Sequence, residues 1–128
     1  MVGSSICRAL SIKGYGEECG GAIIKCSRKE IDFRNQSKVQ KWFEQKQPDV
    51  VIIAAAKVGG ILANKSYPTE FLLENLQIQN NIIENAWKTG VNRLLFLGSS
   101  CIYPKLCSQP IKEEYLLNGF LEPTNESY

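Results

Sequence analysis

Apolar and polar positions alternate along this chain in blocks whose spacing predicts helices and strands in turn. From residue 1 to about 13, apolar positions recur three and four residues apart, which predicts a helix. Gly14-Tyr15-Gly16 ends this helix, and the apolar run Ala22–Cys26 predicts a short strand. A second helix is predicted from about Lys38 to Gln47, with Ser37 as its cap. Its expected inner face consists of Val39, Trp42 and Phe43.

The second half of the chain continues this alternation with longer blocks. Val50–Ala56 is a continuous apolar run rich in β-branched residues, which is typical of a strand covered on both faces. A long helix is predicted from about Thr69 to Thr89, followed by Gly90 at its end and a second buried strand at Arg93–Leu97. The apolar stripe of this helix is wider than packing on a sheet requires, so part of it could meet another helix or a second subunit. The stripe has a central row at Leu72, Leu76, Ile83 and Trp87, broadened by Phe71, Ile78, Ile82 and Ala86.

This order of elements predicts an open α/β sheet of parallel strands joined by helical crossovers. Ligands of such sheets bind beyond the carboxyl ends of the strands. Those ends carry Ser27-Arg28, Lys57–Gly60 and Gly98–Cys101, so small and polar groups are expected to gather at one edge.

Composition narrows the class of protein. The chain has 128 residues and a net charge of +2, with 44% hydrophobic and 22% charged residues. This suits one small globular domain, or part of a larger one, and argues against disorder. The charge is too small to indicate nucleic acid or an anionic membrane as a partner. No apolar run is long enough for a membrane span, and the N-terminus is not a signal peptide, so we expect a cytoplasmic protein.

Two further counts exclude familiar chemistries. The chain has no histidine, which excludes a Ser-His-Asp triad, a Cys-His pair and any histidine metal ligand within these residues. Its five cysteines are scattered and form no C-x-x-C pair. We therefore expect reduced thiols and no metal site.

The residues at the strand ends each allow a functional and a structural interpretation. Gly59 and Gly60 permit close approach of a ligand, or form an ordinary turn. Hydroxyls at Ser99 and Ser100 could bind a ligand, or bond only to the nearby backbone. Cys101 could be a catalytic thiol, but from this chain alone a small buried apolar residue is the better interpretation.

Arg28 and Lys29 follow the predicted strand Ala22–Cys26. At this position dinucleotide-binding folds often carry an acidic residue, which bonds the ribose 2′-hydroxyl. A basic residue there suits a 2′-phosphate, which favours NADP over NAD. The structural alternative is a solvated surface pair.

Several blocks carry a more specific pattern: Ala54–Ile61, Asn64, Tyr67-Pro68, Asn75, Leu95–Leu106 and Leu121–Tyr128. Together they resemble the GDP-L-fucose synthases, a family of the extended short-chain dehydrogenase/reductase superfamily. The resemblance runs from about Pro48 to the last residue, and more weakly over residues 1–13. The Gly-Ser-Ser-Cys-Ile-Tyr-Pro block at 98–104 is its most specific part, since related sugar-nucleotide epimerases and dehydratases usually lack that cysteine.

The resemblance implies a Rossmann-like, doubly wound parallel sheet and an NADPH-dependent reaction. The family epimerises GDP-4-keto-6-deoxy-D-mannose at C3 and C5 and reduces its C4 ketone, which gives GDP-L-fucose. Cys101 matches the cysteine that shares acid–base work with a histidine, Tyr128 matches the proton donor at C4, and Ser99 matches the residue that bonds the substrate oxygen. The implied cofactor contacts are Gly3, Arg28, Ala54, Ala55, Ala56, Leu97, Gly98, Ser99 and Ser100. A homodimer is implied as well.

The sequence departs from the family at both ends. The family begins with a strand and a G-x-x-G-x-x-G turn that holds the cofactor pyrophosphate, of which only Gly3 is matched. Beyond Tyr128 the family has a lysine, a histidine and a substrate domain. We therefore expect residues 1–128 to form an incomplete NADP-binding Rossmann domain that is inactive by itself. In the family's strand order 3-2-1-4, the missing strand leaves Ala22–Cys26 with no neighbour linking it to Arg93–Leu97.

Two other functions stay open. One is an NAD-dependent nucleotide-sugar epimerase or dehydratase, against which Cys101 and Arg28 argue. The other is a non-catalytic remnant that dimerises through the broad apolar face of residues 69–89.

Overall fold

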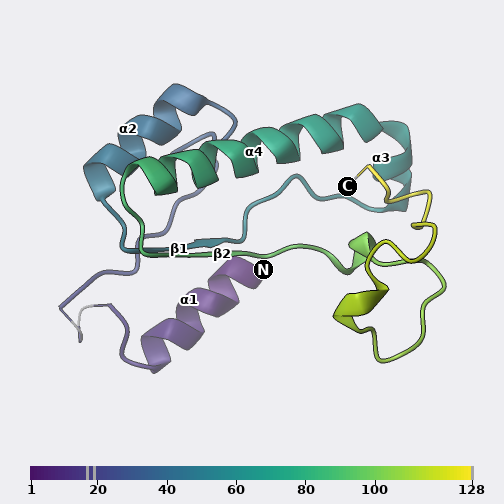
Figure 1. The fold of residues 1–128 in the computed structure, drawn as a ribbon. Helices are drawn as coiled ribbons and strands as arrows, with labels where there is room; N and C mark the ends of the chain where they lie inside the picture. Colours follow the sequence, from purple (N-terminus) through teal and green to yellow (C-terminus); the bar gives the residue numbers. More distant parts are fainter. Residues whose placement is uncertain (17, 19, 128) are drawn as a thin grey trace.

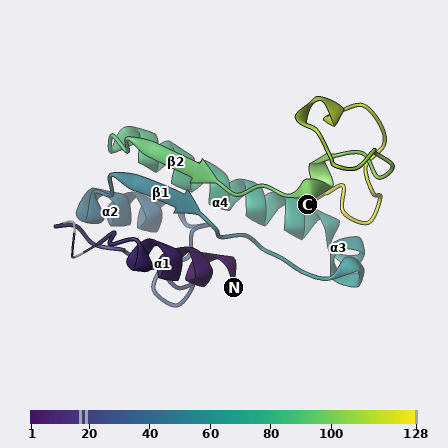
Figure 2. The ribbon, with the colours of Figure 1, turned by 90° about the horizontal axis from the view of Figure 1, so that it is seen from below.

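The helices and strands follow one another in the order that a parallel α/β fold requires. A computed structural model describes residues 1–16, 18 and 20–127. The elements are α1 (Val2–Ile12), α2 (Gln36–Lys46), β1 (Val50–Ile53), α3 (Ile61–Ser66), α4 (Pro68–Lys88), β2 (Arg93–Phe96) and the short 3-10 turns η2 (Ser100–Ile102) and η3 (Glu113–Tyr115). Three layers result: α1 on one face, the sheet in the middle, and α2 with α4 on the other face (Figures 1 and 2). No helix of the described residues combines the length and apolarity needed to cross a bilayer.

The two strands are parallel, as predicted, and pair directly. Val50 is opposite Arg93 and Ile53 is opposite Phe96. Both strands are shorter than expected, and the prediction that both are buried is wrong. All four residues of β2 are exposed, and in β1 only Ile53 is buried while Val50 is 55% exposed. The reason is that the described residues cover both strands incompletely, and β1 contacts α4 mainly on one face.

The predicted strand at Ala22–Cys26 is not formed. These residues are extended, but in the described structure they pair with no strand. A strand exists only where a neighbour accepts and donates its backbone hydrogen bonds, and apolar character alone cannot supply that neighbour. The expected strand order is wrong as well, because β2 pairs directly with β1, whereas the order 3-2-1-4 placed the missing strand beside Arg93–Leu97.

Helices α1, α2 and α4 lie close to their predicted positions, whereas α3 was not predicted. Two details of the predicted helices need correction. Asn35, not Ser37, caps α2, because its side-chain oxygen accepts the N–H of Lys38 at 3.0 Å. The inner face of α4 consists of the residues that were expected only to broaden it: Phe71, Ile78, Ile82 and Ala86 are buried. The expected central row, which includes Leu72 and Trp87, is exposed, because α2 and β1 pack against the other side of α4. Gly90, with φ +75°, follows the helix end as predicted.

The hydrophobic core lies on one side of the sheet only. It consists of Ile31, Val39, Phe43, Ile53, Ile78, Ile82 and Ala86, contributed mainly by α2, β1 and α4. Asn81 and Asn85 are buried beside it and are satisfied by main-chain carbonyls, since Asn81 donates to Phe33 O and Asn85 donates to Asn81 O, each at 2.8 Å. Helix α1 contributes no buried residue.

Candidate functional site

The carboxyl ends of both strands meet at one edge of the sheet, as the parallel topology requires. Ala54, Ala55 and Ala56 follow β1, while Leu97, Gly98, Ser99 and Ser100 follow β2. The predicted convergence of these segments is therefore present in the structure. Gly3 joins them from the first turn of α1, where a Cβ on Gly3 would lie 3.6 Å from the Cβ of Ala54.

Arg28 lies against the segment that follows β1. One of its terminal nitrogens donates a hydrogen bond of 2.9 Å to the carbonyl oxygen of Ala56. Both residues line a cavity of about 350 Å³, together with Cys26, Asp32, Phe33, Arg34, Ala54, Ala55, Glu74 and Ile78. This volume lies within the range of small-molecule sites, roughly 300–1,000 Å³. The predicted cofactor residues Arg28 and Ala54–Ala56 thus share one cavity.

A chain of ion pairs crosses the rim of this cavity. Arg34 pairs with Asp32 and with Glu74, each at 2.9 Å, and Glu74 also pairs with Lys57 at 2.6 Å. The hydrogen bonds from Arg34 lower the pKa of Asp32 from 3.8 to about 2, and the hydrogen bond from Lys57 lowers the pKa of Glu74. Both carboxylates of the cavity are thereby compensated by cations. Within the described residues Arg28 forms no ion pair, so the cavity has a cation available for an anionic ligand.

Asn75 fixes the loop that leaves β1. Its side-chain oxygen accepts the N–H of Lys57 at 2.7 Å, and its side-chain nitrogen donates to the carbonyl of Lys57 at 3.1 Å. One amide therefore replaces the hydrogen bonds of a neighbouring strand. The sequence pattern did not predict this role of Asn75, nor the Asp32–Arg34–Glu74–Lys57 chain of ion pairs. An asparagine on the inner side of an amphipathic helix was the available signal.

Packing against α3 and α4 requires a glycine at position 59. A Cβ at this position would lie 2.7 Å from Cζ of Phe71 and 3.0 Å from Cβ of Ala63. At Gly60 a Cβ would meet nothing within 4 Å. Packing therefore explains the glycine at 59, while both interpretations stay open for Gly60.

The serines and the cysteine after β2 form a short turn. The Oγ of Ser99 accepts the N–H of Cys101 at 3.2 Å and so caps η2, which is the local backbone bond considered for it. Cys101 is half-buried and carries a free thiol, as do Cys7, Cys26 and Cys107 among the described residues. Tyr128, the predicted proton donor, lies outside the described residues.

The segment that leads toward Tyr128 folds back on the loop that follows η2. Lys105 forms an ion pair with Glu122 at 2.7 Å, and its N–H donates to the carbonyl of Phe120 at 2.9 Å. The hydrogen bond from Lys105 lowers the pKa of Glu122. Asn64 of α3 donates to the side-chain oxygen of Asn125 at 2.8 Å. These contacts hold residues 120–125 against the loop that follows η2 and against α3.

Comparison with known proteins assigns this arrangement to a family. The model of the NAD dependent epimerase/dehydratase family matches residues 1–128, and the chain belongs to that family. Its α/β fold, with parallel strands and helices on both faces, is the fold predicted from the sequence.

Comparison with individual relatives points to a narrower group within this family. The chain is 51% identical over 128 residues to the GDP-L-fucose synthase of Sinorhizobium fredii (strain NBRC 101917 / NGR234), which confirms the resemblance found in the sequence. That match covers 100% of this chain and 39% of the relative, so the chain spans well under half the length of the protein it matches.

Two solved structures share the arrangement. The protein DdhaC superposes with a TM-score of 0.90 at 43% identity, over 99% of this chain and 35% of its own. MlghC, a GDP-mannoheptose C4 reductase from Campylobacter jejuni with NADP bound, superposes with a TM-score of 0.83 at 36% identity, over 95% of this chain and 37% of its own.

Proposed function

We propose that this chain is the cofactor-binding part of an NADPH-dependent enzyme that converts GDP-4-keto-6-deoxy-D-mannose to GDP-L-fucose. One observation carries the proposal: Arg28, which forms no ion pair in the described structure, shares a cavity with Ala54–Ala56 at the carboxyl edge of a parallel sheet. The identity to GDP-L-fucose synthases supports the substrate.

The residues of the cavity suit a phosphorylated adenosine. Ala54, Ala55 and Ala56 have small side chains, which allow a flat ligand to approach the backbone closely. Arg28 uses one of its donors on Ala56 and keeps others for the 2′-phosphate. We propose contacts to the rest of the cofactor from Gly3 and from Leu97, Gly98, Ser99 and Ser100. When bound, NADPH supplies the hydride for the C4 carbon.

Three side chains are the proposed catalytic groups. Epimerisation beside a ketone needs a group that takes a proton from carbon and a group that returns one to the other face. Cys101 has a free, half-buried thiol and is the proposed partner in that exchange. Ser99 is proposed to hold the substrate oxygen, for which its Oγ has a free proton, since it only accepts from Cys101. Tyr128 is the proposed donor of the proton to the C4 oxygen.

The test is a chimera in which residues 1–128 replace the matching segment of the Sinorhizobium fredii enzyme. We expect the chimera to form GDP-L-fucose, and the 128-residue chain alone to form none. Cys101→Ser should lower epimerisation at least ~100-fold, the smaller end of the usual effect of a general acid–base group. Cys107→Ser is the matched control and should retain activity. A Cys101→Ser chimera as active as its parent would contradict the assignment.

Cofactor choice gives a second measurement on the same chimera. Arg28→Ala should raise the NADPH KM by roughly tenfold, as expected when one charge-assisted hydrogen bond is lost, and leave the NADH KM unchanged. The neighbouring substitution Lys29→Ala controls for overall charge. An equal loss with both cofactors would favour the NAD-dependent alternative.

We also propose that the exposed side of α4 is an interface between two copies. Leu72, Leu76, Ile83 and Trp87 lie on this side, and Trp87 is 80% exposed. Large apolar side chains gathered on one helix face are typical of an association surface. Sedimentation of the chimera with and without Trp87→Lys tests this, and a dimer that persists unchanged in the variant would exclude this face.

A further inference from the structure

Two other parts of the chain hold the residues that come shortly before Tyr128. Helix α3 provides one contact, since the side-chain nitrogen of Asn64 donates to the side-chain oxygen of Asn125 at 2.8 Å. The loop after η2 provides the other, through the 2.7 Å ion pair between Lys105 and Glu122. Asn125 lies three residues before Tyr128, so their Cα atoms are at most about 11 Å apart. A contact that fixes Asn125 therefore also restricts the position of Tyr128.

Asn64 is buried in a helix whose apolar residues are not. It is 9% exposed and is the one buried residue of α3, whereas Ile61 and Leu62 of the same helix are exposed. Burial of apolar surface would select the reverse arrangement, because a side-chain amide is costly to bury unless it is hydrogen-bonded. The one side-chain hydrogen bond of Asn64 in the described structure is the bond to Asn125. The place of Asn64 is therefore explained by the segment that it holds.

Helix α3 is itself fixed against α4. A Cβ at Gly59 would lie 3.0 Å from Cβ of Ala63 and 2.7 Å from Cζ of Phe71, so the loop after β1, α3 and α4 are in close contact. Helix α4 also contacts β1. The position of Asn64, next to Ala63, is thereby related to the sheet, and its hydrogen bond transfers that relation to Asn125.

The turn that contains Asn125 is formed by its own bonds. The carboxylate of Glu122 accepts from the N–H and the hydroxyl of Thr124 at 3.4 and 3.2 Å, and the carbonyl of Glu122 accepts the N–H of Asn125 at 2.9 Å. None of these bonds involves α3. The bond from Asn64 therefore acts on the position of this turn and not on its shape.

We propose that Asn64 is a positioning residue for the reduction at C4, acting through Asn125 on Tyr128. The proposal rests on the proposed function, in which Tyr128 donates a proton to the C4 oxygen. In that step the C4 carbon gains the hydride and its oxygen gains the phenolic proton. The C=O bond becomes the C–O–H of an alcohol, and NADP⁺ and a phenolate remain. A proton donor acts only within about 2.6–3.2 Å of the atom that it protonates, so a small displacement of the donor slows the step.

Epimerisation is proposed to use a different side chain, Cys101, which lies in η2 directly after β2. The turn around Cys101 is closed locally, since its N–H donates to Oγ of Ser99 at 3.2 Å. The bond from Asn64 is not part of this turn. Loss of Asn64 should therefore slow the reduction and leave epimerisation in place, whereas a purely structural role would slow both reactions.

The test measures both reactions on the chimera that carries residues 1–128. Oxidation of NADPH reports the reduction. Uptake of deuterium from D₂O at C3 and C5 of the 4-keto sugar, with NADP⁺ in place of NADPH, reports epimerisation alone. Asn64→Ala should lower kcat of the reduction by about tenfold, which is the equivalent of one net hydrogen bond. The KM for the GDP-sugar and the rate of deuterium uptake should stay at the values of the parent chimera.

Two further variants identify the bond as the cause. Asn125→Ala removes the same bond from its other end and should reproduce Asn64→Ala, and the double variant should be no slower than either single variant. Asn125→Asp keeps an acceptor oxygen for the nitrogen of Asn64 and should retain the reduction. Asn118→Ala is the matched control, because Asn118 bonds to the carbonyl of Glu114 within the C-terminal segment and should leave both rates unchanged. Circular dichroism checks the fold of every variant.

Three results would overturn the proposal. These are a reduction by Asn64→Ala as fast as that of the parent, an equal loss of reduction and deuterium uptake, and losses that multiply in the double variant. A parent chimera that catalyses neither reaction would contradict the proposed function and this proposal with it. The parent chimera therefore distinguishes failure of the proposed function from failure of the role of Asn64.

Discussion

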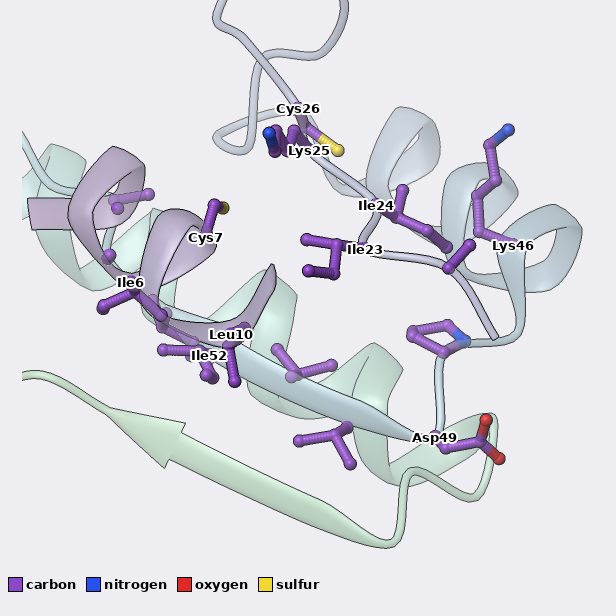
Figure 3. A pocket seen from close by; sticks show the side chains of 18 of the residues that line it. Ile6, Cys7, Leu10, Ile23, Ile24, Lys25, Cys26, Lys46, Asp49 and Ile52 are labelled. Carbon is purple, nitrogen blue, oxygen red and sulfur yellow. The ribbon is translucent and has the colours of Figure 1, made fainter. Parts of the chain in front are cut away.

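The two sides of β1 differ in how far they are packed. Toward α2 and α4, Val39 and Phe43 are 0% and 1% exposed, and the buried asparagines find main-chain partners. Toward α1, the helix contributes no buried residue and an apolar groove separates it from residues 22–26 (Figure 3). The two helices α1 and α2 have the same length, 11 residues, and both are amphipathic. An amphipathic pattern is therefore enough to form a helix on either side of β1. Close packing of that helix also needs paired strands beneath it.

The largest expected effect of a single substitution is on the packed side. Phe43→Ala removes a fully buried ring and should lower the free energy of unfolding by about 3–5 kcal/mol. Ile6→Ala, on the groove wall of α1, should lower it by roughly 1 kcal/mol or less, because this side chain loses few contacts. Urea denaturation followed by circular dichroism measures both. Equal losses would show that the two sides are packed alike.

Two glycine-to-alanine substitutions, one on each side of β1, should change the free energy of unfolding by a moderate amount and in opposite directions. Gly59→Ala drives a Cβ into Phe71 and should destabilise by about 1–3 kcal/mol. Gly3→Ala places its Cβ at an ordinary 3.6 Å from Ala54 within α1, and should stabilise by about 0.5–1 kcal/mol through helix propensity. Thermal unfolding of the two variants measures the difference. A stabilised Gly59→Ala would contradict the tight contact between this loop and α4.

The smallest effect concerns the ion pairs that border the packed side. The pKa of Asp32 is lowered from 3.8 to about 2 by Arg34, so its ionised form stabilises the fold above pH ~4 and this contribution disappears as the pH falls through about 2. Asp32→Asn should therefore be less stable than the wild type at neutral pH, by a small amount because the pair is exposed, and equally stable only well below pH 2, at about pH 1. Unfolding curves at several pH values measure this. Glu126→Gln is the control, and an Asp32→Asn difference that is as large at about pH 1 as at neutral pH would exclude the pair as its cause.

Features that depend on neighbouring residues were predicted better than features that depend on distant parts of the chain. The helices at 1–13 and 69–89 were predicted within a residue or two, since their periodic spacing and end signals, such as Gly90, are local. The strand at 22–26 was not, because strand formation depends on a neighbour elsewhere in the chain. The cap of α2 was misplaced because both Asn35 and Ser37 are good caps, and only the backbone geometry selects between them.

The candidate site shows the same division. The gathering of Ala54–Ala56 and Leu97–Ser100 at one edge followed from the alternation of elements, and Arg28 from its position along the chain. Its bond to Ala56 did not, since these residues lie 28 positions apart. The buried side of α4 was also decided in three dimensions, because its apolar stripe is wide enough to face either way.

The sequence by itself determined the α/β class, the positions of the helices, the parallel direction of the strands and the family to which the chain is similar. These depend on spacing and on short motifs, which are properties of neighbouring residues. Only the tertiary structure decided which apolar residues are buried and which strands pair. The physical reason is that burial and backbone pairing each need a partner from a distant part of a chain, and the pattern of one segment cannot state whether that partner is in place.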